Sequence, residues 1–425
     1  MPEPKPGDKV SIKTEKEEFE GILMPRPEIL DKDITVLKLD NGYNIGIDSK
    51  KIKEIKVIEQ YKKKAETKKE SKTNKSLPTV SILSAGGTIS SKVDYKTGGV
   101  IADYTAEDFL EMLPELKDIA NIRAKNIASL MSEDMTSDDW RMIAEAVEKE
   151  INDEKVDGVI VTQGTDTLHF TAAALSFMLK NITKPIIITA SQRSIDRGSS
   201  DAFMNLSCAI RAAAKSDIAE VMTCLHNSTN DDFCLLLKGA KVRKMHSSRR
   251  DAFRPINSVP IAKVYENGKI DITDPYYNKR KEGKIELETK FEKKVGILYT
   301  YPGIDPKLLD SFKDYKGIVI AGTGLGNIPQ SMFKKVEDLI KDGVAVVITT
   351  QTIYGSTHPL VYQNLRMLSI KMDCIFVQDM LPETAYVKLG WVLSKTKKLD
   401  EVRELMQKNI AGEISERNTD ESFLY

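Results

Sequence analysis

Cysteine, histidine and tryptophan are scarce in this sequence of 425 residues, with four, four and two copies respectively. The cysteines, Cys208, Cys224, Cys234 and Cys374, show no C-x-x-C spacing and are too few for a disulfide scaffold. The histidines are scattered and form no H-x-x-x-H pair, so we expect no metal site. These shortages argue against a small secreted disulfide fold and against a zinc enzyme.

Long apolar runs and an excess of one charge are also absent. No apolar stretch reaches membrane-spanning length, and the N-terminus, Met1 to Lys5, lacks the apolar core of a signal peptide. We therefore expect a cytoplasmic protein. The 63 basic residues balance 63 acidic ones, so no overall positive field would gather nucleic acid. This balance argues against the chain being a main nucleic-acid-gripping surface.

What the sequence does contain is typical of a globular α/β protein. With 41% hydrophobic and 30% charged residues, 425 residues are too many for one core, so two or three domains are expected. From Thr79 onward, strand-like and helix-like segments alternate, as in a parallel sheet with crossover helices. We expect strands at 80–84, 159–162, 186–189, 295–300, 318–321 and 344–349, and helices at 138–150, 168–179 and 334–341.

The chain divides into four segments by pattern. Residues 1–60 contain strand-like runs at 9–13, 34–39 and 43–47, with the hairpin turn Asp40-Asn41-Gly42 between the last two, which predicts a small SH3-like β-barrel. Residues 61–77 are lysine-rich and without apolar periodicity, which is typical of a flexible linker. A supporting contact to nucleic-acid phosphates is the alternative. Two lobes follow, at 78–268 and 291–425, separated by a charged, irregular stretch.

Two glycine-flanked threonines carry the chemistry. Gly86-Gly87-Thr88 and Gly164-Thr165-Asp166 each follow an apolar strand, so both threonines would lie beyond the carboxyl ends of strands, where ligands bind in open α/β sheets. A threonine hydroxyl is a weak nucleophile that needs a neighbouring base. Lys244 can be that base, and a carboxylate can orient it. Thr165, Asp166 and Lys244 supply these parts, and Thr88 supplies a second hydroxyl.

Each of these features also has a purely structural interpretation. Thr165-Asp166 would serve as a helix N-cap pair, Ser132-Glu133 as a capping box ahead of the helix at 138–150, and Ser137 or Asp138 as its N-cap. His169, Trp140 and Trp391 fall on helical patterns and are expected to be packed residues. Neither Gly86-Gly87-Thr88 nor the run from Gly322 to Asn327 matches a phosphate-binding or dinucleotide-binding loop.

Taken together, several segments resemble the bacterial-type L-asparaginase family of amidohydrolases. The matching segments lie at 83–89, 132–135, 163–167, 199–201, 239–244 and 321–327. The resemblance covers the chain from about Pro78 and implies a two-lobed asparaginase-like core. It also implies that Thr88 is the nucleophile and that Thr165, Asp166 and Lys244 handle the proton. By the same resemblance Ser132 and Glu133 hold the α-amino and α-carboxylate groups of the substrate, and Tyr95 is the mobile-loop tyrosine.

Within this family the chain is most similar to the D subunits of archaeal glutamyl-tRNA(Gln) amidotransferases. Stand-alone asparaginases often differ at Gln163, Glu133 and Ser194, whereas segments 354–365 and 379–389 look like the D subunits. This likeness implies release of ammonia from glutamine (or asparagine) for a tRNA-binding, kinase-type partner subunit. ATP and Mg²⁺ would bind to the partner subunit, and this chain would bind no cofactor. The partner would also hold most of Glu-tRNA(Gln). This chain would form a homodimer within the larger heteromer. A free cytoplasmic L-asparaginase and a catalytically idle amino-acid-binding module are the alternatives.

Overall fold

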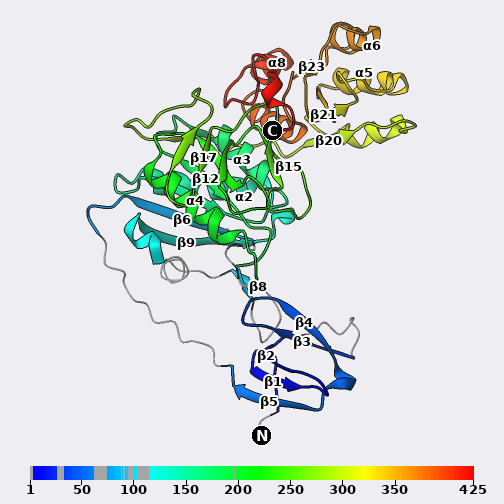
Figure 1. The fold of residues 1–425 in the computed structure, drawn as a ribbon. Helices are drawn as coiled ribbons and strands as arrows, with labels where there is room; N and C mark the ends of the chain where they lie inside the picture. The colour runs from blue at the N-terminus through cyan, green and yellow to red at the C-terminus, as the bar shows by residue number, and fades with distance from the viewer. Residues whose placement is uncertain are drawn as a thin grey trace.

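The structure, a computed structural model, describes residues 3–25, 33–61, 74–87, 89, 91–93, 100–102, 114–195 and 197–425. Three units follow one another along the chain (Figure 1). We call them the β-unit, which carries the first sheet, the N-lobe, which carries an eight-stranded sheet, and the C-lobe, which carries a four-stranded sheet. The two lobes lie against each other, and the β-unit lies at the far end of the N-lobe (Figure 1). The described residues include no helix with the length and apolar character of a membrane span.

The β-unit is a five-stranded antiparallel sheet in the order β4-β3-β2-β1-β5. Its strands are β1 (Lys9–Lys13), β2 (Glu18–Leu23), β3 (Ile34–Lys38), β4 (Asn44–Asp48) and β5 (Glu54–Glu59). Val10, Ile12 and Leu37 are fully buried and form a core separate from the lobes. The three predicted strands and the hairpin turn are confirmed, whereas β2 and β5 were not predicted.

The eight strands of the N-lobe sheet run in the order β18-β17-β14-β13-β12-β10-β6-β9. The five neighbouring strands β13, β12, β10, β6 and β9 are parallel to one another. The three strands at the other edge, β14, β17 and β18, pair in antiparallel fashion. The strands are β6 (Thr79–Gly86), β9 (Asn121–Leu130), β10 (Gly158–Thr162), β12 (Ile186–Thr189), β13 (Val221–His226), β14 (Cys234–Lys238), β17 (Ala262–Val264) and β18 (Ile270–Ile272). Three two-stranded ribbons accompany them: β7 (Ser91–Val93) with β8 (Val100–Ala102), β11 (Leu179–Lys180) with β19 (Glu286–Leu287), and β15 (Val242–Lys244) with β16 (Phe253–Pro255).

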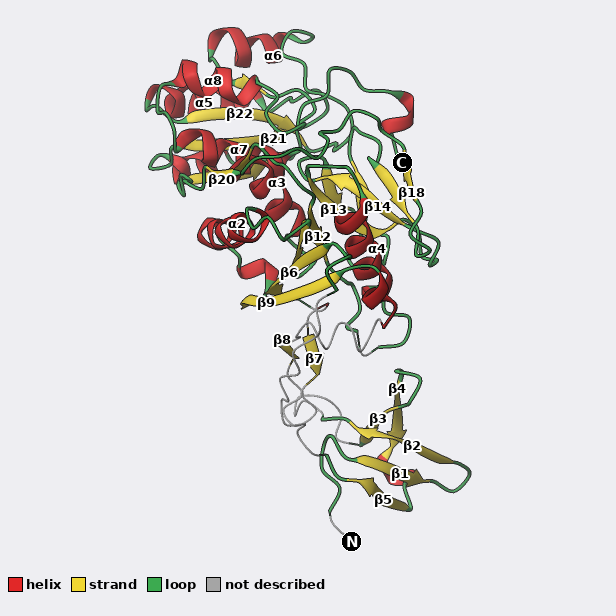
Figure 2. Ribbon diagram, turned by 90° about the vertical axis from the view of Figure 1, so that its left-hand side faces the viewer, coloured by secondary structure: helices red, strands yellow, loops and turns green. Residues whose placement is uncertain are grey.

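Helices cover both faces of this sheet (Figure 2). Helices α2 (Ser137–Ile151) and α3 (Leu168–Met178) lie on one face, and α4 (Ala202–Lys215) lies on the other. Because successive side chains of a strand point to opposite faces, Val159 and Val161 of β10 join the α2/α3 core, while Ile160 joins the α4 core. A sheet buried on both faces explains why its strands read as unbroken apolar runs.

The C-lobe repeats this architecture on a smaller scale. Its parallel strands are β20 (Val295–Tyr299), β21 (Gly317–Gly322), β22 (Ala345–Thr350) and β23 (Ile375–Phe376). Its α-helices are α5 (Phe333–Lys341), α6 (Gln363–Arg366), α7 (Pro382–Leu393) and α8 (Leu399–Gln407). α7 packs on α3, and residues of both helices belong to one continuous apolar core. The two lobes are therefore joined through buried side chains and not through a solvated hinge.

The start of α2 differs from the prediction. The helix begins at Ser137, and its N-cap is Thr136 and not the expected Ser137 or Asp138. Thr136 and Asp139 form a capping box, with the Thr136 backbone N–H donating to Asp139 Oδ2 at 2.7 Å. Ser132 and Glu133 belong instead to a separate 3-10 turn, Ser132–Asp134, so the structural interpretation of this pair as a capping box is wrong.

Candidate active site

Lys244, Thr165 and Asp166 meet at the carboxyl end of β10. The Lys244 ammonium donates to Thr165 Oγ1 at 2.8 Å and to Asp166 Oδ1 at 2.6 Å. Thr165 and Asp166 lie in the loop between β10 and α3, and Lys244 is the last residue of β15. The contact joins residues 79 positions apart in sequence. A hydroxyl, an amine and a carboxylate in this order have the composition of a proton relay.

The three groups differ in exposure. The Lys244 side chain is 8% exposed, whereas the Asp166 side chain is 65% exposed. The protein therefore shields the Lys244 ammonium from water, whereas the Asp166 carboxylate faces the solvent from which a substrate would arrive. Thr165 is not the N-cap of α3, because that position is Thr167. The interpretation of Thr165-Asp166 as a helix cap pair is therefore wrong.

His169 lies in the first turn of α3, directly behind this cluster. Its burial, followed by the charges of Arg243 and Lys244, lowers the pKa of His169 to about 3. A histidine that binds a proton so weakly is a poor general base near neutral pH. His169 is a packed helix residue, as predicted. Trp140 and Trp391 are buried as well, as expected for core residues.

The glycine loop after β6 touches the loop that carries Thr165. Gly87 has a φ of +83°, and a Cβ built on it would lie 2.3 Å from the backbone carbon of Gln163 and 2.3 Å from the nitrogen of Gly164. Only a glycine fits such a close approach of two backbones. The two glycine loops predicted to carry the chemistry are therefore in contact. Thr88 and Tyr95 lie outside the described residues, so their catalytic and substrate-binding roles stay predictions.

Ser132 lies beside the same loop, and Glu133 follows it at the surface. A Cβ on Gly164 would come within 2.8 Å of Ser132 Oγ, and Thr167 Oγ1 donates to the Ser132 carbonyl oxygen at 2.6 Å. Ser132 is buried and Glu133 is exposed. Ser132 therefore lies beside the loop that carries Thr165, and the substrate-holding roles of Ser132 and Glu133 stay predictions.

The C-lobe residues that hold the lysine-bearing strand were not predicted from the sequence. Lys241 Nζ lies 2.5 Å from Asp379 Oδ2, and both side chains are at most 3% exposed. Thr384 Oγ1 donates to the Ala240 carbonyl oxygen at 3.1 Å. A signal for these contacts was present, because basic side chains recur at Lys241 and Arg243 and acidic ones at Asp379 and Glu383.

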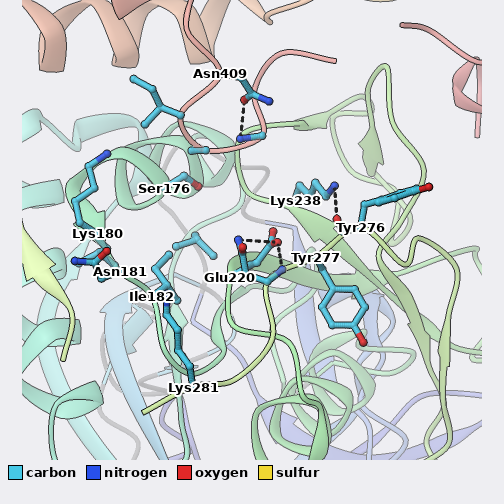
Figure 3. Close-up of a pocket in the computed structure, with 16 residues that line it drawn as sticks. Ser176, Lys180, Asn181, Ile182, Glu220, Lys238, Tyr276, Tyr277, Lys281 and Asn409 are labelled. Carbon is cyan, nitrogen blue, oxygen red and sulfur yellow. Dashed lines mark hydrogen bonds between the residues drawn. The ribbon is translucent and has the colours of Figure 1, made fainter. Parts of the chain in front are cut away.

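The hollow in Figure 3 is a different feature. It has a volume of about 580 Å³, and its lining includes Lys180, Glu220, Lys238 and Lys281, but none of Thr165, Asp166 and Lys244. Glu220 precedes β13, so the hollow lies near the amino end of that parallel strand, away from the carboxyl edge that bears Thr165. Lys238 is held by Asp274 at 3.0 Å, and Lys180 and Lys281 point toward opposite ends of the hollow. Its lysines therefore do not converge on one ligand.

Three protein-family models match the chain. They are "GatD N-terminal domain" over residues 4–58, "Asparaginase, N-terminal" over residues 79–277 and "Glutaminase/Asparaginase C-terminal domain" over residues 294–406. The chain is 50% identical over 410 residues to the glutamyl-tRNA(Gln) amidotransferase D subunit of Thermococcus kodakarensis, covering 96% of this chain and 92% of that protein. The chain belongs to the family of glutamyl-tRNA(Gln) amidotransferase D subunits.

Other members of this D-subunit family match to a similar extent. The protein of that name from Pyrococcus furiosus is 49% identical, covering 96% of this chain and 94% of that protein. The one from Methanobrevibacter smithii is 45% identical, covering 98% and 96%. The predicted resemblance is thereby confirmed for both the asparaginase-like core and the D-subunit branch. The domain boundaries predicted from the sequence remain predictions.

Solved structures give the same fold for the two lobes. The thermostable L-asparaginase from Thermococcus kodakarensis superposes with a TM-score of 0.72 at 30% identity, covering 80% of this chain and 100% of that chain. The L-asparaginase I from Vibrio cholerae gives a TM-score of 0.69 at 28% identity, covering 80% and 99%. The predicted two-lobed asparaginase-like α/β fold is confirmed.

Proposed function

We propose that this chain is the amide-hydrolysing subunit of a glutamyl-tRNA(Gln) amidotransferase and releases ammonia from glutamine. The observation that carries the proposal is the Lys244 ammonium held 2.8 Å from Thr165 Oγ1 and 2.6 Å from Asp166 Oδ1, in a chain 50% and 49% identical to two proteins of that name. A free L-asparaginase is the second candidate, and it is favoured by the fold likeness to two asparaginases.

The reaction we propose has two steps. A threonine oxygen attacks the side-chain amide carbon of glutamine, the carbon–nitrogen bond breaks, and ammonia leaves with the proton that the hydroxyl gave up. Water then attacks the acyl-enzyme ester, which releases glutamate and restores the threonine. Thr88 is our first choice of nucleophile, by family resemblance, with Thr165, Lys244 and Asp166 moving the proton. Backbone N–H groups near Gly87 and Gly164 would stabilise the oxyanion, a contribution of about 3 kcal/mol per donor in other enzymes.

The remaining steps belong to a partner subunit in this proposal. Converting Glu-tRNA(Gln) to Gln-tRNA(Gln) requires a carboxylate to be activated by ATP and a polyanion to be gripped. The loop Gly322 to Asn327 does not have the pattern of a nucleotide-binding loop, and the chain has equal numbers of basic and acidic residues. We therefore assign ATP, Mg²⁺ and most contacts to tRNA to a kinase-type partner in the cytoplasm. We also propose a two-fold homodimer of this chain within that heteromer.

The test is to measure glutamine and asparagine hydrolysis by the chain alone, with the partner subunit, and with Glu-tRNA(Gln) and ATP added. Hydrolysis serving a partner should rise about tenfold or more on assembly, equivalent to about 1.4 kcal/mol of barrier. Thr88→Ala tested in parallel should abolish the activity if Thr88 is the nucleophile. Equal rates in all three conditions, with asparagine the better substrate, would favour the free asparaginase instead.

A further inference from the structure

The strand that carries Lys244 lies outside the main sheet of the N-lobe, and of its three residues Val242 alone is buried in the shared core. β15 contains three residues and, among the strands that the structure describes, pairs only with β16, in a ribbon separate from the eight-stranded sheet of the N-lobe. A two-stranded ribbon is marginally stable when nothing packs on it. The direction of the Lys244 side chain therefore depends on the groups that contact β15 from outside the ribbon.

Alternation along β15 directs Arg243 away from Lys244. Successive side chains of a strand point to opposite faces, so Lys244 faces Thr165 while Arg243 faces the C-lobe. There Arg243 Nη2 lies 2.9 Å from Glu383 Oε1, at the start of α7. Tyr299, at the end of β20, donates its hydroxyl to the same carboxylate oxygen at 3.4 Å. Residues of two C-lobe elements, α7 and β20, thus meet at the carboxylate that pairs with Arg243, next to the candidate catalytic lysine.

Glu383 is itself firmly placed. It lies in the first turn of α7, directly after Pro382, where a negative charge is favoured by the helix dipole. α7 is anchored by Val387 and Leu389 in the core shared by the two lobes. The Glu383 side chain is 7% exposed and that of Arg243 is 20% exposed, so water screens this pair only in part. Removing one partner would leave the other charge nearly buried and without its counterion.

We propose that Arg243 and Glu383 are positioning residues for Lys244. Their ion pair holds β15 against the C-lobe at the position from which the Lys244 ammonium reaches both Thr165 and Asp166. The C-lobe then contributes to the chemistry of the N-lobe without contacting substrate. This inference rests on the amide hydrolysis proposed above, and it names the groups that keep the lysine in place for it.

The first experiment measures glutamine hydrolysis by the chain assembled with its partner subunit. Glu383→Gln keeps the shape of the side chain and removes its charge, so kcat should fall about tenfold while KM changes less than about twofold, as expected for a misplaced catalytic group. The double variant Arg243→Gln/Glu383→Gln should recover part of this loss, because no charge is left unpaired. A merely structural role predicts that the single and double changes lower the melting temperature and leave kcat unchanged, which would overturn the proposal.

Glu288→Gln is the matched control. Glu288 and Lys395 also join the two lobes, with 2.5 Å between Oε2 and Nζ, but this pair is partly exposed and does not involve β15. The control should leave kcat within about twofold of the unmodified chain, since exposed ion pairs contribute little. Should Glu383→Gln not fold, Tyr299→Phe and Arg243→Lys test the same contacts with smaller changes. A normal kcat in both of these variants would count against the proposal.

A second readout does not depend on activity. Competitive acetylation followed by mass spectrometry reports how freely each lysine amine reacts, and Lys244 can be compared with the exposed Lys398 of the same chain. Glu383→Gln should raise the labelling of Lys244 about threefold or more, and Glu288→Gln should not, because only the first releases β15. Unchanged labelling of Lys244 would overturn the positioning role. If the assembled, unmodified chain hydrolyses neither amide, the proposed function fails, and the labelling still decides the positioning role.

Discussion

The two lobes each end a central strand of their sheet in a glycine–threonine loop, but among the described residues only the N-lobe loop meets a distant cation. In the N-lobe, Thr165 follows β10 and accepts a hydrogen bond from Lys244 at 2.8 Å. In the C-lobe, Thr323 follows β21, and its hydroxyl donates to Asn327 of its own loop at 3.4 Å. The local sequence is similar in both places. What distinguishes them is a lysine brought to the N-lobe loop from another strand.

The comparison of the two loops shows which part of the site is set by residues that are neighbours in the sequence. A strand followed by Gly-Thr places a hydroxyl at the carboxyl edge of a parallel sheet in either lobe. In the C-lobe loop the hydroxyl satisfies its own backbone and closes a turn, since Thr323 and Asn327 also form a β-bridge. In the N-lobe loop the hydroxyl is held by a nearly buried amine. The position of the Lys244 amine at the N-lobe loop therefore depends on β15 and its supports.

The largest expected effect separates the two threonines. Thr165→Ala and Lys244→Ala should each lower kcat/KM for glutamine by about a thousandfold or more, because residues of one proton relay act as a unit. Thr323→Ala, the matched change in the C-lobe loop, should stay within about twofold of the unmodified chain, as its hydroxyl serves only its own turn. The measurement is steady-state glutaminase kinetics of the assembled enzyme. Near-normal turnover of Lys244→Ala would refute the relay.

A smaller effect separates two glycines of these loops. Gly87→Ala should destabilise the protein by about 3 kcal/mol, because the added methyl meets the backbone of Gln163 and Gly164 and the positive φ is strained. Gly324→Ala has a positive φ but open space around its Cβ, so the loss should be about 1 kcal/mol. Chemical denaturation of both variants measures the difference. Equal losses of stability in the two variants would show that the close contact between the N-lobe loops does leave room for a methyl group at Gly87.

The smallest effect concerns the helix behind each loop. α3 buries His169 behind Thr165, whereas α5, which follows the C-lobe loop, buries Val336 and Leu339. The pKa of His169 is lowered from 6.5 to about 3, so the folded state resists a proton that the unfolded state binds. This contribution to stability is complete above pH 6.5 and is lost progressively as the pH falls toward 3.

The corresponding variant is His169→Gln, with the exposed His246→Gln as its control. Between pH 7.5 and pH 5, the unmodified chain should lose about 2 kcal/mol more unfolding free energy than His169→Gln does. His246→Gln should follow the unmodified chain, because the His246 side chain is exposed and not buried behind the loop. Denaturation curves at the two pH values give both differences. Parallel losses in all three proteins would contradict the burial of a neutral His169.

Much of the fold was predictable because its signals are local. The strands at 159–162 and 186–189 are unbroken apolar runs, and the helix at 168–178 has both the length and the composition of a buried helix. Errors occurred where two local signals compete. Thr136, Ser137 and Asp138 are all good N-caps, and only the reciprocal bonds with Asp139 decide for Thr136. In the β-unit, β2 and β5 were not predicted, although three of the six residues in each are apolar.

The sequence by itself determined most strands and helices of the two lobes and the two glycine-threonine turns, because each depends on neighbours a few positions apart. Tertiary structure alone decided that Lys244 binds Thr165 and not Thr323, a contact that spans 79 positions of sequence. It also decided that Asp379 binds Lys241, across 138 positions. Such contacts leave no periodic trace in a single chain. They form because the shared core fixes α3 and α7 against each other, and an almost buried charge is stable only where that packing supplies its partner.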